Sequence, residues 1–162
     1  MDLRTQLEQA VRHAVSSLLE TMIPIDFQQT DLAQAATVTG QHLLGMIQVN
    51  GRFNGSIAVS VPTDLAMAMT AAMLEEEIDE LNDDVYETVA EMINMIAGGI
   101  KSHLSQHEEI FLLGLPQVLE LSGSGGVVQD ANRIAVPIDT EKGRLMVLST
   151  LYESPGRDES AS

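Results

Sequence analysis

The chain has 162 residues, 44% of them apolar, which suffices for one globular domain with a substantial core. Its net charge of −16 argues against a nucleic acid or an anionic membrane surface as partner, because both attract clustered Lys and Arg. The chain contains no cysteine, which excludes disulfides, thiolate metal sites and a cysteine nucleophile.

Residues 3–21 are predicted to form an amphipathic helix that ends before Pro24, because apolar side chains recur there at helical spacing. No basic segment followed by a long apolar run precedes this helix, so no signal peptide is expected. No stretch of the chain approaches the roughly 18 apolar residues that a membrane span requires. We therefore expect a cytoplasmic protein.

Three strands and a second helix are predicted next along the chain. The strands cover residues 35–39, 43–49 and 56–61. Two Asn-Gly pairs lie between the last two strands, and such pairs favour a hairpin. The second helix begins near Pro62 and continues through the Ala- and Met-rich residues 65–76, which are good helix formers.

A long helix over residues 84–105 follows, with Asp84 as its cap and Glu87 at the third helical position, an arrangement like a capping box. Residues 122–126 are rich in Gly and Ser and read as a flexible loop. We expect one domain over residues 1–152 and a disordered tail over 153–162. Three further strands are predicted after the long helix, over residues 117–123, 133–138 and 144–152.

A weak internal repeat relates the two halves of the chain at an offset of 92 residues. Pro24 then pairs with Pro116, and Gly51 pairs with Gly143, which lies in a predicted hairpin turn. The order helix, strand, hairpin occurs in both halves. We therefore predict a duplicated α+β domain whose helices pack on one face of a mostly antiparallel sheet.

The helix over residues 84–105 has two faces of different character, since each residue advances about 100° around the axis. Its predicted buried face consists of Val85, Val89, Met92, Ile96, Ile100 and His103. The opposite face carries a set of residues that we call the polar stripe: Glu87, Glu91, Asn94, Gly98 and Lys101. Polar residues opposite an apolar face are what any surface helix shows, so the polar stripe alone does not identify a site.

Two adjacent glycines, Gly98 and Gly99, lie inside this helix, although each costs about 1 kcal/mol relative to Ala. Gly98 lies on the polar stripe one turn after Asn94, where a missing side chain lets another protein come close. Gly99 points toward the flank, where it would ease packing inside the domain. The notched face beside Glu91 and Asn94 therefore indicates a docking surface.

Glu87, Glu91 and Asn94 are followed by Pro116 after 21 intervening residues, and residues 94–101 read NMIAGGIK. This pattern resembles the active-site helix of the CheC/CheX/FliY family of chemotaxis phosphatases, in which Asp or Ser, Glu, Asn and Pro stand at the same spacing. Glu87 departs from the family's Asp or Ser. The first long helix has no Glu-x-x-Asn, and this single site makes the chain most similar to the CheX branch.

The resemblance implies a CheC-like fold and a phosphatase that hydrolyses the aspartyl phosphate of a CheY-type response regulator. Asn94 would orient the attacking water, since an amide offers both a donor and an acceptor. Glu91 would dock a Lys of the regulator by a charge-assisted hydrogen bond. Glu87, Gly98 and Lys101 would contact the same partner.

The resemblance also implies a homodimer and no cofactor beyond a Mg²⁺ that the response regulator supplies. Pro116 is assigned to shaping the chain after the helix rather than to chemistry. Two alternatives to a phosphatase remain open. One is a non-catalytic module that binds a response regulator or a flagellar-switch component, and the other is a structural dimer that uses the sheet edge.

No metal site is predicted. His103 and His107 are four residues apart, a spacing that can bind metal, but no Glu of the zincin pattern and no clear third ligand accompany them. The acidic residues 79–84 lack the spacing and central Gly of a calcium loop.

Overall fold

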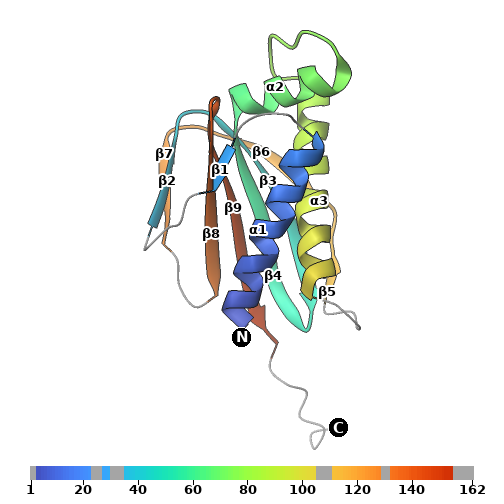
Figure 1. Ribbon diagram of the computed structural model, residues 1–162, viewed down its shortest axis with the longest axis vertical. Helices are drawn as coiled ribbons and strands as arrows, with labels where there is room; N and C mark the ends of the chain where they lie inside the picture. The colour runs from blue at the N-terminus through green and yellow to red at the C-terminus, as the bar shows by residue number, and fades with distance from the viewer. Residues whose placement is uncertain (1–2, 23–26, 30–34, 105–110, 129–131, 155–162) are drawn as a thin grey trace, which may run out of the picture.

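The computed structural model describes residues 3–22, 27–29, 35–104, 111–128 and 132–154. Within these ranges, three helices cover one face of a β-sheet (Figure 1). The elements in chain order are α1 (Leu3–Met22), β1 (Phe27–Gln29), β2 (Ala35–Thr39), β3 (His42–Gly51), β4 (Phe53–Pro62), α2 (Thr63–Leu74), α3 (Asp83–Leu104), β5 (Phe111–Leu113), β6 (Gln117–Leu121), β7 (Ser124–Val128), β8 (Arg133–Thr140) and β9 (Gly143–Glu153).

The main sheet is antiparallel, with the strand order β1-β8-β9-β4-β3-β5, and β6 also pairs with β3. The hairpins β3–β4 and β8–β9 lie side by side through the pairing of β4 with β9. Their turns use Gly51 at φ 149° and Gly143 at φ 118°, values that favour glycine. The predicted duplicated α+β fold is therefore confirmed, with the two hairpins at the centre of the sheet.

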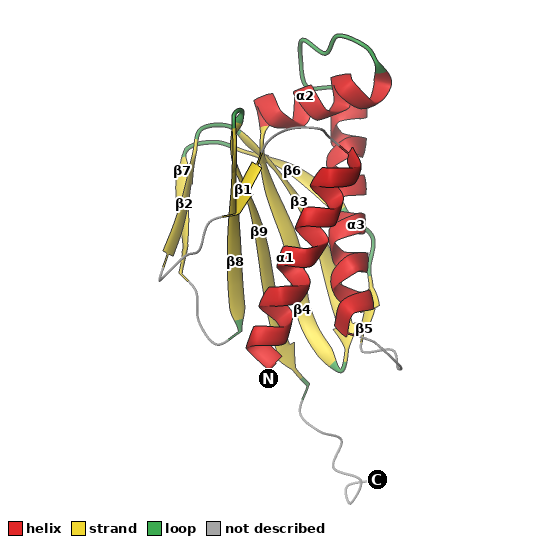
Figure 2. Cartoon of the chain, viewed as in Figure 1, coloured by secondary structure: helices red, strands yellow, loops and turns green. Residues whose placement is uncertain are grey.

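The core lies between the sheet and the layer formed by α1 and α3, which lie side by side and run roughly along the strands (Figure 2). Gly45 in β3 lets α3 sit close to the sheet, because a Cβ there would lie 3.0 Å from Val89 Cγ1 and 3.4 Å from Ile93 Cβ. Gly99 in α3 does the same for the two helices, because a Cβ there would lie 3.0 Å from Ala14 Cβ. The predicted packing role of Gly99 is confirmed.

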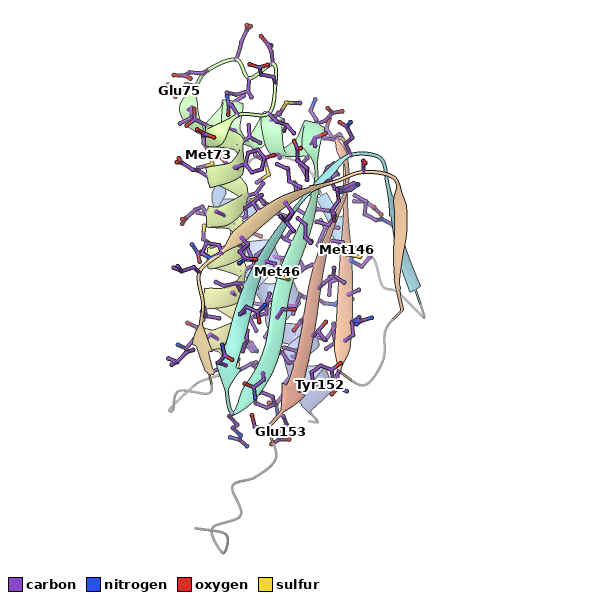
Figure 3. The ribbon with its side chains drawn as sticks, turned by 180° about the vertical axis from the view of Figure 1, so that it is seen from behind. Met46, Met73, Glu75, Met146, Tyr152 and Glu153 are labelled. Carbon is purple, nitrogen blue, oxygen red and sulfur yellow. The ribbon has the colours of Figure 1, made fainter. Side chains whose placement is uncertain are left out.

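The opposite face of the sheet carries no helix of the described residues. Seen from behind, Met46, Met146 and Tyr152 lie on this face (Figure 3). Two of the exposed leucines, Leu119 and Leu121, belong to β6, which pairs with β3 at the edge of the sheet. Apolar side chains therefore line part of the face and its edge.

The structure differs from the sequence prediction at the short and Gly-rich strands. The loop predicted for residues 122–126 is wrong, because Ser124–Val128 form β7 and pair with β2. A Gly-rich segment forms a strand only when a partner strand is available, and β2 is that partner. No local sequence pattern reveals such a pairing. β1 and β5 were also not predicted, since three residues show no clear alternation. Of the predicted tail, Glu153 ends β9, and residues 155–162 lie outside the described ranges.

Candidate functional site

The helix α3 carries the polar stripe and begins one residue earlier than predicted. The predicted cap at Asp84 is wrong, because the Val85 N–H donates to the side chain of Asn82 at 3.0 Å. Asp83 and Asp84 lie instead in the first turn, where the helix dipole favours carboxylates. Asn82 thus sets the start of the helix and, through it, the direction in which each later side chain points.

The inner face of α3 is anchored on two sides. Thr88 Oγ1 donates to the Asp84 carbonyl at 2.8 Å and accepts from Thr70 Oγ1 of α2 at 2.9 Å, so buried hydroxyls join the two helices. The residues of α3 that are buried are Val85, Thr88, Val89, Met92, Ile93, Ile96, Ala97 and Ile100. The predicted apolar face is confirmed apart from His103, which is exposed in the last turn beyond this core.

The outer face of α3 presents the polar stripe to solvent. Glu87, Glu91 and Asn94 are exposed, whereas Gly98 and Lys101 are half-buried. Neighbours on one helix face stand three or four residues apart, about 5–6 Å between Cβ atoms, so Glu91 and Asn94 reach the same region outside the helix. A carboxylate and an amide at this distance can together hold a cation and a water molecule at the surface of an approaching protein.

The two glycines of α3 face different surroundings. A Cβ added at Gly98 would meet nothing within 4 Å, whereas one added at Gly99 would press against Ala14 of α1. Packing inside the chain therefore explains Gly99 and leaves Gly98 unexplained. Open space beside Asn94 is what the approach of a second protein would require.

Pro116 lies on the sheet edge rather than on α3. β5 and β6 both pair with β3, and between them the Gly114 N–H donates to the Gln48 carbonyl at 2.9 Å. Pro116 lacks an N–H and stands at this interruption, which is where an edge strand tolerates proline. This position fits the predicted structural role.

The edge strand also contacts α3 through a side-chain pair that the sequence did not reveal. Tyr86 of α3 stands next to Glu120 of β6. Burial raises the pKa of the Tyr86 phenol above its ordinary value of 10.0, and the neighbouring carboxylate of Glu120 raises it further. The pair places the beginning of α3 beside β6, the strand that follows Pro116.

The described residues contain no group of three or more His, Cys, Asp or Glu side chains placed to hold a metal ion. None of the described helices is long and apolar enough to cross a membrane. His107, which the sequence pairs with His103, lies outside the described residues.

Comparison with known sequences identifies the family. Residues 43–139 match the profile of the family described as chemotaxis phosphatase CheX, a range that spans more than half of the chain and contains all of α3. The chain belongs to the CheX family. The predicted membership in the CheC-like phosphatases is thus confirmed, and with it the assignment as an enzyme. No curated protein matches this sequence.

Solved CheX structures share the fold. CheX from Vibrio vulnificus superposes with a TM-score of 0.76 at 21% identity, covering 94% of this chain and 100% of that chain. CheX from Desulfovibrio desulfuricans gives 0.74 at 24% identity, covering 90% and 99%. The CheX-CheY-BeF3-Mg²⁺ complex from Borrelia burgdorferi gives 0.65 at 20% identity, covering 90% and 97%. These similarities confirm the predicted CheC-like fold.

Proposed function

We propose that this CheX-family protein hydrolyses the aspartyl phosphate of a CheY-type response regulator at the outer face of α3. The observation that carries the proposal is the joint exposure of Glu91 and Asn94 on one helix face, with open space beside Gly98. The crystallised complex of the Borrelia burgdorferi relative with CheY supports the choice of partner.

Asn94 is proposed to orient the attacking water. An acyl phosphate is already activated, so the enzyme needs a water held in line with the scissile P–O bond rather than a strong nucleophile. The Asn94 amide has a donor and an acceptor on one group, which lets it fix the orientation of that water. The rate gain then comes mainly from positioning.

Glu91 is proposed to bind a Lys of the regulator that also faces the phosphoryl group. A charge-assisted hydrogen bond from this Lys would fix how the two proteins meet, and it would place Asn94 over the phosphoryl group. Glu87 lies one turn before Glu91 on the same exposed face and is proposed to contact the regulator. Gly98 and Lys101 continue the contact surface toward the end of α3.

The Mg²⁺ that balances the phosphoryl charge is proposed to come with the regulator. The relative's complex contains both CheY and Mg²⁺, and the described residues of this chain offer no three-ligand cluster. The task of this chain is then to bring one carboxylate and one amide to a metal site that its partner has already formed. A regulator of this kind acts inside the cell, so we place the protein in the cytoplasm.

We further propose that the protein works as a single domain and as a homodimer. Within the described residues no strand pairs with the outer edge of β6, and Leu119 and Leu121 are about half exposed there. An apolar edge strand of this kind favours pairing with another strand. A second copy of the chain is the proposed occupant.

The deciding experiment mixes the protein with phosphorylated regulator and Mg²⁺ and follows the loss of phosphate. We expect wild type to accelerate the loss and Asn94→Ala to abolish most of the acceleration, about 100-fold or more. Asn50→Ala, which removes an exposed amide at the β3–β4 hairpin, is the matched control and should behave as wild type. An Asn94→Ala variant as fast as wild type would disprove the assigned role.

The departure at Glu87 favours one second candidate, a CheX-like module that binds the regulator without hydrolysis. Regulator affinity separates the two functions when it is measured beside the rate. Binding without acceleration by wild type would support the second candidate. Glu91→Lys should weaken binding in either case, because it places like charges together, and unchanged affinity would remove Glu91 from the interface.

A further inference from the structure

A groove of about 330 Å³ lies between α1 and α3. Its walls include Ser17, Met95 and Ser102, and the small residues Ala14 and Gly99 lie where the helices approach most closely. His13 of α1 and His103 of α3 face each other across it. Neither histidine belongs to the polar stripe, and the proposed reaction uses neither.

The two imidazoles are close enough to share one ion. Their ring centres are 5.8 Å apart and their planes are inclined by 40°. A Zn–N bond is about 2.0–2.1 Å long, so each ring centre lies about 3.2 Å from a bound ion, and two rings on one ion are at most about 6.4 Å apart. The observed separation corresponds to an angle of about 130° at the ion, and a small change of side-chain rotamer brings it to the tetrahedral value.

We propose that His13 and His103 bind one transition-metal ion of the Zn²⁺, Ni²⁺ and Cu²⁺ class in the groove between α1 and α3. Imidazole nitrogens suit these ions, whereas Mg²⁺ prefers oxygen ligands. No third His, Cys, Asp or Glu among the described residues joins the pair, so water completes the coordination. The net charge of −16 attracts cations to the surface in general, and the imidazole pair supplies the selectivity.

The ion joins two helices that lie far apart in the sequence. The unfolded chain does not hold His13 and His103 together, so the ion binds the folded protein preferentially and stabilises it. The bridge also fixes the end of α3 that follows Gly98 and Lys101 against α1. Metal binding therefore supports the helix that carries the polar stripe without taking part in its chemistry.

Thermal unfolding of the untagged protein with and without ZnCl₂ tests the proposal. At a free Zn²⁺ concentration about 100-fold above Kd, Tm should rise by about 5–10 °C, and EDTA should reverse the rise. His13→Gln and His103→Gln should each lose most of the shift, and MgCl₂ should produce none. Cu²⁺ bound to wild type should give an electron paramagnetic resonance spectrum with nitrogen couplings that both variants reduce.

Two outcomes overturn the proposal. A Zn²⁺ shift that persists in the His13→Gln/His103→Gln double variant would place the ion elsewhere. The absence of any shift in wild type at millimolar Zn²⁺ would mean that the rings only stack on each other, as rings at about this separation do. Neither result depends on phosphatase activity, so the metal site can fail while the proposed function stands, and the reverse holds as well.

Discussion

Gly98→Ala separates the needs of folding from those of partner binding. The new Cβ would meet no atom of the chain within 4 Å, so it creates no clash and leaves no cavity. Replacing a helical glycine by alanine then gains about 1 kcal/mol of stability. For a domain of this size the gain corresponds to a rise in Tm of about 2–4 °C. Because folding does not require a glycine at position 98, we expect this glycine to serve partner binding at the outer face of α3.

The same substitution should impair function. The methyl group would stand on the polar stripe one turn after Asn94, where the regulator is proposed to approach. We expect Gly98→Ala to bind phosphorylated regulator more weakly and to slow its dephosphorylation, although the protein itself is more stable. Titration calorimetry measures the affinity for phosphorylated regulator, and phosphate loss over a range of enzyme concentrations measures the rate of dephosphorylation.

Gly99→Ala is the matched control, because it makes the same chemical change one residue further along the same helix. Its Cβ would lie 3.0 Å from Ala14 Cβ and 3.6 Å from Ala14 Cα, so α1 and α3 would have to move apart. Overpacking of this kind costs about 1–3 kcal/mol, which offsets or exceeds the gain in helix propensity. We expect Tm to stay level or to fall. The reasoning is refuted if Gly98→Ala is as active as wild type, or if Gly98→Ala is the less stable of the two variants.

Three further changes test the fold and the assembly. Gly45→Ala should lower the free energy of unfolding by about 1–3 kcal/mol in a urea titration, because its Cβ would press on Val89, and an unchanged midpoint would contradict the close contact of α3 with the sheet. Tyr86→Phe should flatten the loss of stability at alkaline pH. Because its pKa is raised, the phenol holds its proton more tightly in the folded state than in the unfolded state. The stability that this proton contributes is complete below pH 10.0 and is lost as pH rises through the folded-state pKa. Equal slopes of unfolding free energy against pH in wild type and variant would contradict this expectation. Leu119→Lys should shift a dimer toward a folded monomer in sedimentation, and an unaltered dimer would place the interface elsewhere.

The long elements were predictable because their signals are local. The helix predicted over residues 84–105 begins one residue after α3 does and includes the rest of α3, since apolar side chains at helical spacing mark the whole buried face. The hairpins followed from Gly-containing turns at Gly51 and Gly143. The polar stripe could be predicted for the same reason, because all of its residues belong to one helix and helical geometry places them together.

The features that were missed depend on residues distant in the sequence. β7 is a strand because it pairs with β2, and nothing within Ser124–Val128 signals that partner. His103 was assigned to the buried face by its angle alone, but the core beneath α3 does not reach the last turn. Its neighbour His13 stands on another helix, so no spacing in the sequence could have joined the two imidazoles. Contacts of this kind appear only once the helices are packed.

The exchange of strands between the two halves affects how the chain folds as it is made. β1 pairs with β8, β3 pairs with β6, and β4 finds its second neighbour in β9, the last strand of the described residues. When only the first half of the chain has left the ribosome, the β3–β4 hairpin therefore still lacks the neighbouring strands β6 and β9. Pairings that span most of the chain form slowly, because a long loop must close before any contact repays its entropy. The sheet beneath α3 is complete only after β9 emerges, so a nascent chain cannot hold α3 rigidly before residues 143–153 have been made.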